Sequence, residues 1–251
     1  MKTILITGSS GFIGTSLMEK LRGRYRIIPF DKKDGFDIFD SGLDNFVKMA
    51  DVVVHLAAII DVQHSFRHPK ETFNTNVLGT ALVAAACIKN KKKLVYTSSA
   101  AVKEPSSSPY AKSKYLAEEI VANVPRACIL RLYNVYPGKS VISKFLKNKQ
   151  IVVNGDGTQS RDFINVEDVV SIIGESFKWS GLIEVGTGKA ITINEVADIV
   201  SDVTGKDIVF RDGVKEVYES KANVKKLKLL YKKRLRTNLN KDILKIYENG
   251  L

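Results

Sequence analysis

Three glycines spaced three residues apart, Gly8, Gly11 and Gly14, constrain the fold of this chain more than any other feature. They follow an apolar, β-rich run at 3–7 and open a segment at 11–21 that has helical spacing. Glycine permits a tight turn and a close approach of the backbone to a phosphate, and the first turn of the helix offers N–H groups to the anion. The pattern predicts a phosphate-binding turn; a glycine turn without a ligand is the alternative.

Predicted strands and helices alternate along most of the chain. Apolar runs at 25–30, 51–60, 93–98, 127–132 and 182–185 predict strands, and helical periodicity predicts helices at 72–89, 110–122, 166–177 and 192–204. This alternation is typical of an α/β protein with a Rossmann-type, doubly wound parallel sheet. We expect a dinucleotide-binding domain at 1–134 and, interleaved with it, a smaller C-terminal lobe at 135–251 that mainly binds substrate.

Composition excludes some classes of protein. The 251 residues are 44% hydrophobic, and no stretch approaches the ~18 consecutive apolar residues of a membrane span. The N-terminus has no signal-peptide pattern, and Cys87 and Cys128 stand in apolar contexts that favour packing over redox chemistry. We therefore expect a cytoplasmic protein without membrane association.

The chain carries a formal net charge of +12, concentrated in runs at 89–93 and 221–245. Such runs are usually solvated surfaces, although a positive field also attracts nucleotides or nucleic acid. The tail from Lys221 alternates basic and apolar residues and predicts an amphipathic helix covering the C-terminal lobe, with RNA binding as the less favoured reading. His55 falls in a predicted buried strand and His64 and His68 in a predicted loop, without metal-ligand spacing, so no metal is expected.

An acidic residue marks the end of the second predicted strand. Asp31 lies 20 residues after Gly11, where a carboxylate would accept hydrogen bonds from the adenosine ribose and repel a 2′-phosphate. This favours NAD over NADP as the cofactor. The adjacent Lys32 and Lys33 leave the alternative open, because either ammonium could pair with a 2′-phosphate.

A tyrosine and a lysine lie four residues apart in the predicted helix at 110–122. Tyr110 and Lys114 therefore face the same way, and the ammonium would stabilise the phenolate form of the tyrosine. Such a pair is an acid/base usable near neutral pH; a solvated pair on a helix surface is the alternative.

The G-x-x-G-x-x-G spacing and a series of later motifs resemble the extended short-chain dehydrogenase/reductase family, in its nucleotide-sugar epimerase/dehydratase branch. The resemblance extends over most of the chain. It rests on TGSSGFIG, HLAA, NVLGT, YTSSAAV, YAKSK, LRLYNVYPG, GDGTQSRDFINVEDV and VGTGKAITINEVA, in that order.

The resemblance implies that Tyr110 exchanges a proton with a substrate hydroxyl or ketone while hydride passes between the sugar and the nicotinamide. Lys114 would bind the nicotinamide ribose and lower the pKa of Tyr110, and Ser99 would hydrogen-bond the reacting oxygen. Capping of the following turn is the alternative role for Ser99.

The resemblance also implies binding residues. Those for the cofactor are Gly8, Gly11, Phe12, Ile13, Gly14, Asp31, Asp37, Ile38, Leu56, Ala57, Ala58, Asn76, Tyr110, Lys114 and Tyr133. On the substrate side, Ser99, Asn134 and Arg161 match residues that contact the sugar nucleotide, and the fork of Arg161 suits a diphosphate. An ion pair with Asp162 or Asp168 is the alternative role for Arg161. A homodimer through the predicted helices 72–89 and 110–122 is also implied.

The sequence departs from the family pattern at the substrate side. Val102 is followed by Lys103 and Glu104 instead of Tyr-Gly, and Ala100 and Ala101 replace the Asp-Glu pair with which dehydratases remove water. The missing pair disfavours elimination, and the resemblance then implies NAD-dependent epimerisation of the UDP-glucose/UDP-galactose type. The alternatives are an NAD(P)-dependent reductase or dehydrogenase for a nucleotide sugar or small carbonyl compound, and a non-catalytic dinucleotide-sensing or RNA-associated protein.

Overall fold

The computed structural model describes residues 1–213 and 218–250, and it divides into two compact units. Unit 1 comprises Met1–Arg131 and Val170–Ile183, and unit 2 comprises Leu132–Val169 and Glu184–Leu251. The chain therefore leaves unit 1 after Arg131, returns to it for one short segment, and ends in unit 2.

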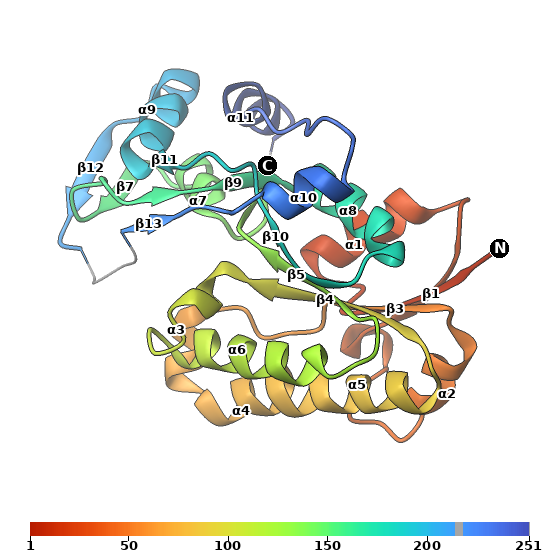
Figure 1. Ribbon diagram of the computed structural model, residues 1–251. Coiled ribbons are helices and arrows are strands. Elements are labelled where there is room, and N and C mark those ends of the chain that lie inside the picture. The colour runs from red at the N-terminus through yellow and green to blue at the C-terminus, as the bar shows by residue number, and fades with distance from the viewer. Residues whose placement is uncertain (214–217, 251) are drawn as a thin grey trace. The chain divides into compact units, whose positions relative to one another are not determined.

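Unit 1 is built around a six-stranded sheet in the order β10-β5-β4-β3-β1-β2 (Figure 1). Its strands are β1 (Thr3–Thr7), β2 (Arg26–Phe30), β3 (Val52–His55), β4 (Lys93–Ser99), β5 (Cys128–Leu132) and β10 (Gly181–Val185). β1 pairs in parallel with both β2 and β3, and β3 pairs in parallel with β4. This sheet, mostly parallel and flanked by helices, confirms the predicted Rossmann-like α/β fold.

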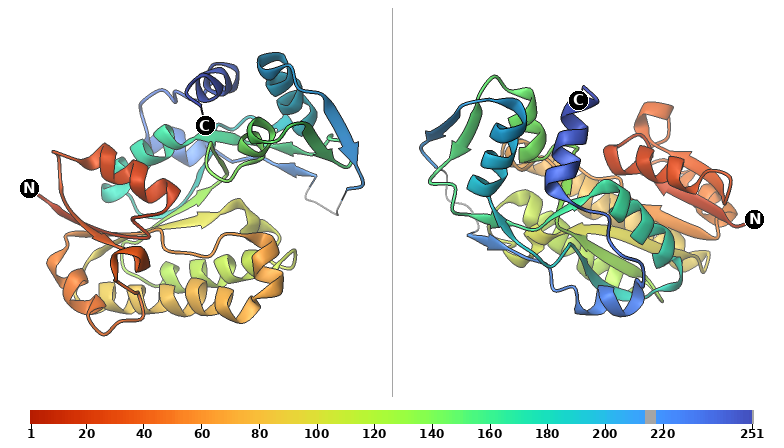
Figure 2. Two further views of the ribbon diagram at one scale, coloured as in Figure 1. Left: turned by 180° about the vertical axis from the view of Figure 1, so that it is seen from behind. Right: turned by 90° about the horizontal axis from the view of Figure 1, so that it is seen from above.

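Helices cover both faces of this sheet, as Figures 1 and 2 show. One face is covered by α2 (Leu43–Met49), α5 (Gly79–Lys89) and α6 (Pro109–Ala122). Two short helices, α3 (Val62–Arg67) and α4 (Pro69–Phe73), come between α2 and α5 in the chain. The other face is covered by α1 (Phe12–Leu21) and the end of α8 (Val166–Glu175). Strand residues such as Leu5, Val53 and Leu94 form one buried cluster with apolar residues of α5 and α6. Burial of these side chains, each worth roughly 1.5–3 kcal/mol, holds α5 and α6 against the sheet.

Unit 2 combines short strands with four helices in its described residues, around a core of its own. Its elements are β6 (Asn134–Tyr136), α7 (Val141–Lys147), β7 (Ile151–Asn154), β8 (Ser160–Arg161), β9 (Phe163–Asn165), β11 (Ile191–Thr192), α9 (Ile193–Thr204), β12 (Ile208–Arg211), β13 (Glu219–Ser220), α10 (Lys225–Leu230) and α11 (Leu239–Glu248). β7 pairs in parallel with β12, and β6 with β9. Phe145, Ile151, Val196, Val200 and Ile243 belong to its buried cluster.

The predicted helix at 192–204 is confirmed together with its capping signal. Thr192 accepts the N–H of Glu195 (3.1 Å), and the Glu195 carboxylate accepts the N–H of Thr192 (2.8 Å). These reciprocal bonds satisfy two backbone donors that a helix N-terminus leaves unpaired. The helix ends at Gly205 in the left-handed conformation.

Two predicted elements have different bounds in the structure. The predicted strand 51–60 ends at His55, because the side-chain amide of Asn76 accepts the N–H of Ile59 (2.8 Å) and donates to its carbonyl (2.8 Å), which holds this segment outside the sheet. The predicted helix 72–89 is interrupted by a π-helical turn at Asn74–Leu78. π-turns within helices are frequent at functional sites.

The prediction of one amphipathic helix in the basic tail is wrong. α10 stops at Leu230, and α11 begins only at Leu239. Between them, the buried carboxylate of Asp168 accepts the backbone N–H groups of Arg236 and Thr237 (2.9 and 2.8 Å), and these bonds compete with a continuous helical ladder.

The histidine prediction also needs correction, because His64 lies in α3 and not in a loop. Its ring lies against that of His68 at an angle of 31°, with the centroids 4.6 Å apart, and its Nε2 is 3.0 Å from Glu71. Both cysteine side chains are buried, as expected. In residues 1–213 and 218–250, no helix has the length and apolarity needed to cross a membrane.

Candidate functional site

The glycine turn between β1 and α1 leaves no room for side chains. Gly8 has a φ of 73°, and a Cβ there would lie 2.6 Å from the backbone nitrogen of Ala57. A Cβ on Gly14 would lie 2.3 Å from the carbonyl oxygen of Gly8. Gly11 is the N-cap of α1 and has no side chain that could accept a hydrogen bond from the first turn. The backbone N–H groups of Phe12 and Ile13, which begin the helix, can therefore donate to an anion. This cradle fits the pyrophosphate of a dinucleotide.

We expect Gly8→Ala to weaken NAD binding at least tenfold and to reduce the free energy of unfolding by about 2–4 kcal/mol, because the methyl meets backbone atoms and the φ is left-handed. Gly23→Ala is the matched control, since Gly23 has a φ of 76° and nothing within 4 Å of its Cβ position. Urea unfolding and calorimetric titration with NAD measure both effects. Equal losses in the two variants would contradict this role of close packing.

The end of β2 places a carboxylate beside this turn. Asp31 accepts the N–H of Ser10 (3.1 Å) through one oxygen and that of Lys33 (3.0 Å) through the other. The ammonium of Lys32 lies 3.0 Å from Asp37, so its charge is balanced within the protein. Ile38 is buried and would touch any Cβ on Gly79. Asp31 thus contacts the turn, and Asp37 and Ile38 belong to the segment that follows β2.

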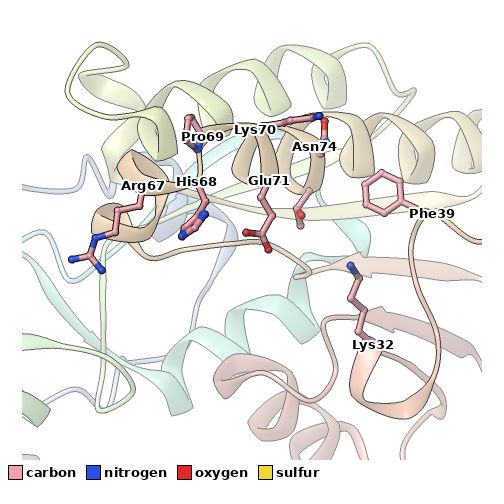
Figure 3. Close-up of a pocket in the computed structure, with 9 residues that line it drawn as sticks. Lys32, Phe39, Arg67, His68, Pro69, Lys70, Glu71 and Asn74 are labelled. Atoms are coloured by element: carbon pink, nitrogen blue, oxygen red, sulfur yellow. The ribbon is translucent and has the colours of Figure 1, made fainter.

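A cavity of about 600 Å³ borders the segment that follows β2 (Figure 3). Lys32 and Phe39 line one side, and Arg67, His68 and Glu71 from α3 and α4 line the opposite side. Phe39 follows Ile38 directly, so the cavity adjoins the segment predicted to hold adenine. Its volume is within the usual range of small-molecule sites.

The exit of β3 is fixed by hydrogen bonds. Leu56 donates its N–H to Thr7 (3.0 Å), and Ala57 lies against Gly8. Ala58 precedes Ile59, whose backbone N–H and carbonyl both form hydrogen bonds with the side-chain amide of Asn76. The same amide also donates to the Ser113 hydroxyl (2.9 Å). The buried amide of Asn76 therefore positions the loop after β3 against α6, a structural role that the sequence did not reveal.

Ser99, Tyr110 and Lys114 lie together at the carboxyl end of β4 and the start of α6. Ser99 ends β4, and its hydroxyl accepts the N–H of Ala101 (3.2 Å), so the predicted capping contact is also present. Tyr110 is buried, which raises the pKa of its phenol, while the Ser99 hydroxyl acts in the opposite direction. Lys114 donates to the Thr97 carbonyl (2.8 Å) and lies 4.3 Å above the Tyr96 ring.

A buried ion pair next to this cluster was missed at the sequence level. Glu118 follows Lys114 by one helical turn, is 5% exposed, and forms a bidentate pair with Arg131 at 2.6 and 3.1 Å. Burial lowers the pKa of Lys114 to about 7, and the negative charge of Glu118 partly opposes this shift. Tyr110, Lys114 and Glu118 are spaced four residues apart, so the sequence already indicates that Glu118 lies on the same helix face as the Tyr-Lys pair.

This depressed pKa predicts a pH-dependent stability difference between Lys114→Met and the wild type. The unfolded chain keeps the lysine proton up to its ordinary pKa of 10.5, and the folded protein only up to about 7. Wild-type stability therefore gains from this group as pH rises from 7 to 9, by up to about 1.4 kcal/mol per unit, whereas the variant gains nothing from it. Urea unfolding at both pH values measures the change, and a difference that is constant with pH would contradict the assignment.

Tyr133 comes directly after β5 and belongs to unit 2. It is 5% exposed, and its hydroxyl donates to Glu184 (2.8 Å), whose carboxylate also accepts the N–H of Asn223 (2.7 Å). The phenol thus belongs to a hydrogen-bonded network within unit 2. Its predicted contact with the nicotinamide stays a prediction.

Asn134 and Arg161 line one cavity of about 480 Å³ in unit 2. Lys139, Lys144 and Gln159 contribute to the same lining. Arg161 donates to the Ser160 carbonyl (2.8 Å). The two carboxylates named as its alternative partners are buried and accept backbone N–H groups: Asp162 from Thr187 and Gly188 (both 2.8 Å), and Asp168 from the segment after α10.

The fold and these residues define a dinucleotide-binding α/β enzyme with a phosphate-binding turn and a buried Tyr-Lys pair. The model of the NAD dependent epimerase/dehydratase family matches residues 4–175. The chain belongs to this family and is an NAD-dependent enzyme.

Comparison with individual proteins agrees with this membership. The chain is 32% identical to a protein of Methanocaldococcus jannaschii named "Putative UDP-glucose 4-epimerase", over 90% of this chain and 92% of that protein. It is 28% identical to the UDP-N-acetyl-alpha-D-glucosaminuronate decarboxylase of Bacillus cytotoxicus, over 90% and 91%. The solved structure of MoeE5 in complex with UDP-glucose and NAD superposes with a TM-score of 0.88 at 27% identity, over 98% of this chain and 97% of that one.

Proposed function

We propose that the chain is a nucleotide-sugar 4-epimerase that interconverts UDP-glucose and UDP-galactose. The observation that carries this proposal is the cluster of Ser99, Tyr110 and Lys114 at the carboxyl end of β4. Ala100 and Ala101 follow Ser99 and carry no group that could assist loss of water. The cluster can therefore transfer a proton to and from an oxygen but lacks the acid and base of an elimination.

The reaction needs one proton transfer in each direction at the sugar O4. Bound NAD, held by the glycine turn and Asp31, would supply the hydride acceptor for the sugar C4 and the donor that reduces the resulting ketone from its opposite face. Tyr110 takes the O4 proton as the ketone forms and gives it back as the ketone is reduced. Ser99 donates a hydrogen bond to that oxygen, and the ammonium of Lys114 stabilises the phenolate. Burial of Tyr110 and Lys114 excludes water that would compete for the proton.

The substrate diphosphate is assigned to the cavity of unit 2. Its lining carries the cations Arg161, Lys139 and Lys144 and the amide of Asn134. A guanidinium binds phosphate oxygens in a bidentate manner, and the ammonium groups add positive charge. Asn134 and Arg161, which were predicted to contact the sugar nucleotide, would thus bind its diphosphate.

A homodimer through α5 and α6 is part of the proposal. Leu78, Leu82 and Tyr115 are 51%, 37% and 36% exposed on or next to these helices. Apolar side chains gathered on one surface are typical of an interface. Sedimentation at equilibrium should give twice the chain mass, and a Leu82→Lys variant should give the chain mass.

The proposed function is tested by incubating the NAD-loaded protein separately with UDP-glucose and UDP-galactose. Product sugars are separated by chromatography while absorbance at 340 nm reports NADH. We expect each sugar nucleotide to yield the other without net NADH. Net NADH formation would replace the proposal with a dehydrogenase, and absence of any conversion with bound NAD would replace it with a binding protein.

A further inference from the structure

A second cavity of unit 1 lies at the edge of the sheet opposite to the glycine turn. Lys2 precedes β1, Asp51 precedes β3, and Lys93 begins β4, and all three side chains line this cavity of about 500 Å³. Since β1, β3 and β4 are parallel, their starts share one edge, near the chain's N mark in Figure 1. We name it the amino-edge cavity; it shares no residue with the Ser99, Tyr110 and Lys114 cluster.

The lining of the amino-edge cavity is strongly positive. Lys2, Lys93 and Arg126, with Lys91 and Lys92, surround it, and Asp51 is its one carboxylate among the described residues. That carboxylate accepts the N–H of Thr3 (2.8 Å). Lys93 donates to the carbonyls of Arg126 and Trp179, and burial lowers its pKa. Cations held around one cavity repel each other, and a bound anion relieves that repulsion.

Two of these cations occupy backbone conformations that favour glycine. Lys91 has a φ of 54° and follows Asn90, the C-cap of α5, a position where helices usually end in glycine. Arg126 has a φ of 60° in a turn that the bond from Ala127 N–H to the Val124 carbonyl (3.1 Å) closes, with Pro125 before it. In such a turn the third residue is normally glycine.

No other non-glycine residue at 1–213 or 218–250 has a positive φ, so both strained positions of the described chain border one cavity. A cation near the C-terminus of α5 or α6 would interact with the helix dipole from any position of the last turn, without this strain. Backbone strain of this kind is concentrated at ligand sites. The chain therefore carries a cation at both positions, although the backbone there favours glycine.

An apolar wall completes the amino-edge cavity. Ile88 is 49% exposed there, Pro125 lies beside it in the lining, and the Phe177 ring is held edge-on by Tyr25, with the centroids 5.5 Å apart. We propose that the amino-edge cavity binds a nucleoside triphosphate, with the phosphates among the cations and the base against this wall. Aromatic and apolar side chains bind the faces of bases without selecting their identity.

The test is calorimetric titration of the NAD-loaded protein with ATP. The variant Lys91→Gly/Arg126→Gly removes two cations and places glycine where the backbone prefers it, so we expect unchanged or higher thermal stability and at least tenfold weaker ATP binding. Lys245→Ala, which removes an exposed cation of α11, should bind ATP as the wild type does. Absence of ATP binding to the wild type, or equal binding by the double variant, would overturn the proposal.

Two further ligands identify which part of ATP is recognised. Inorganic tripolyphosphate should compete with ATP but bind more weakly, because it lacks the base. A single-stranded RNA that binds more tightly than ATP, and whose binding the double variant loses, would overturn the small-molecule proposal in favour of a nucleic-acid surface. Epimerase activity is not required for either result, so the proposal stands or fails separately from the proposed function.

Discussion

Replacing Tyr110 with phenylalanine should lower the rate of sugar interconversion by about 10²–10⁴-fold, the usual contribution of a positioned acid/base. The buried ring is kept, so the fold and NAD affinity should be retained. Tyr115→Phe is the matched control, because Tyr115 lies on the same helix but is 36% exposed. The turnover number of each purified variant, with NAD content measured after denaturation, gives the comparison.

The Tyr110 assignment would be contradicted if Tyr110→Phe kept more than a tenth of the wild-type turnover. It would also be contradicted if Tyr115→Phe lost as much. A loss of both turnover and bound NAD would point to a structural function of the hydroxyl.

Removing Glu118 should have the largest effect on stability. Glu118→Ala leaves the guanidinium of Arg131, 17% exposed in the native protein, without its bidentate partner, and we expect a loss of about 3–5 kcal/mol in the free energy of unfolding. Glu119→Ala, which removes the neighbouring exposed carboxylate, should change this free energy by less than about 0.5 kcal/mol. Urea unfolding followed by circular dichroism measures both.

The double variant Glu118→Met/Arg131→Met separates burial of an unpaired charge from loss of packing. Because it removes both charges, it should recover most of the stability lost in Glu118→Ala. If it is as unstable as the single variant, packing of the carboxylate stem, and not its charge, is responsible.

The phosphate turn and the alternation of elements were predictable because both follow from local rules. Gly11 and Gly14 are required by contacts within a few residues, the left-handed φ of Gly8 is a local requirement of the turn, and the cap at Thr192 needs only Glu195 three positions later. Only the close approach of Gly8 to Ala57 depends on a distant part of the chain. The candidate cluster of Ser99, Tyr110 and Lys114 was predicted from motif order, and the structure adds that Tyr110 and Lys114 are buried while Ser99 is half-buried.

Features that depend on distant partners were not predictable. The end of β3 at His55 depends on the amide of Asn76, and the break between α10 and α11 depends on Asp168, about 70 residues earlier. Glu118 shows its helical spacing in the sequence, but its partner Arg131 lies on the next strand. The strained backbone at Lys91 and Arg126 is likewise invisible to composition, which shows only a run of basic residues.

The central claim is that hydride leaves the sugar C4 and returns to the same carbon within one site. It is tested by supplying UDP-glucose deuterated at C4 to the NAD-loaded protein, in the presence of excess unlabelled NADH, and by examining the UDP-galactose formed by mass spectrometry. The proposed reaction predicts that the product keeps its deuterium at C4. Product that has lost the deuterium to the free NADH pool would contradict it.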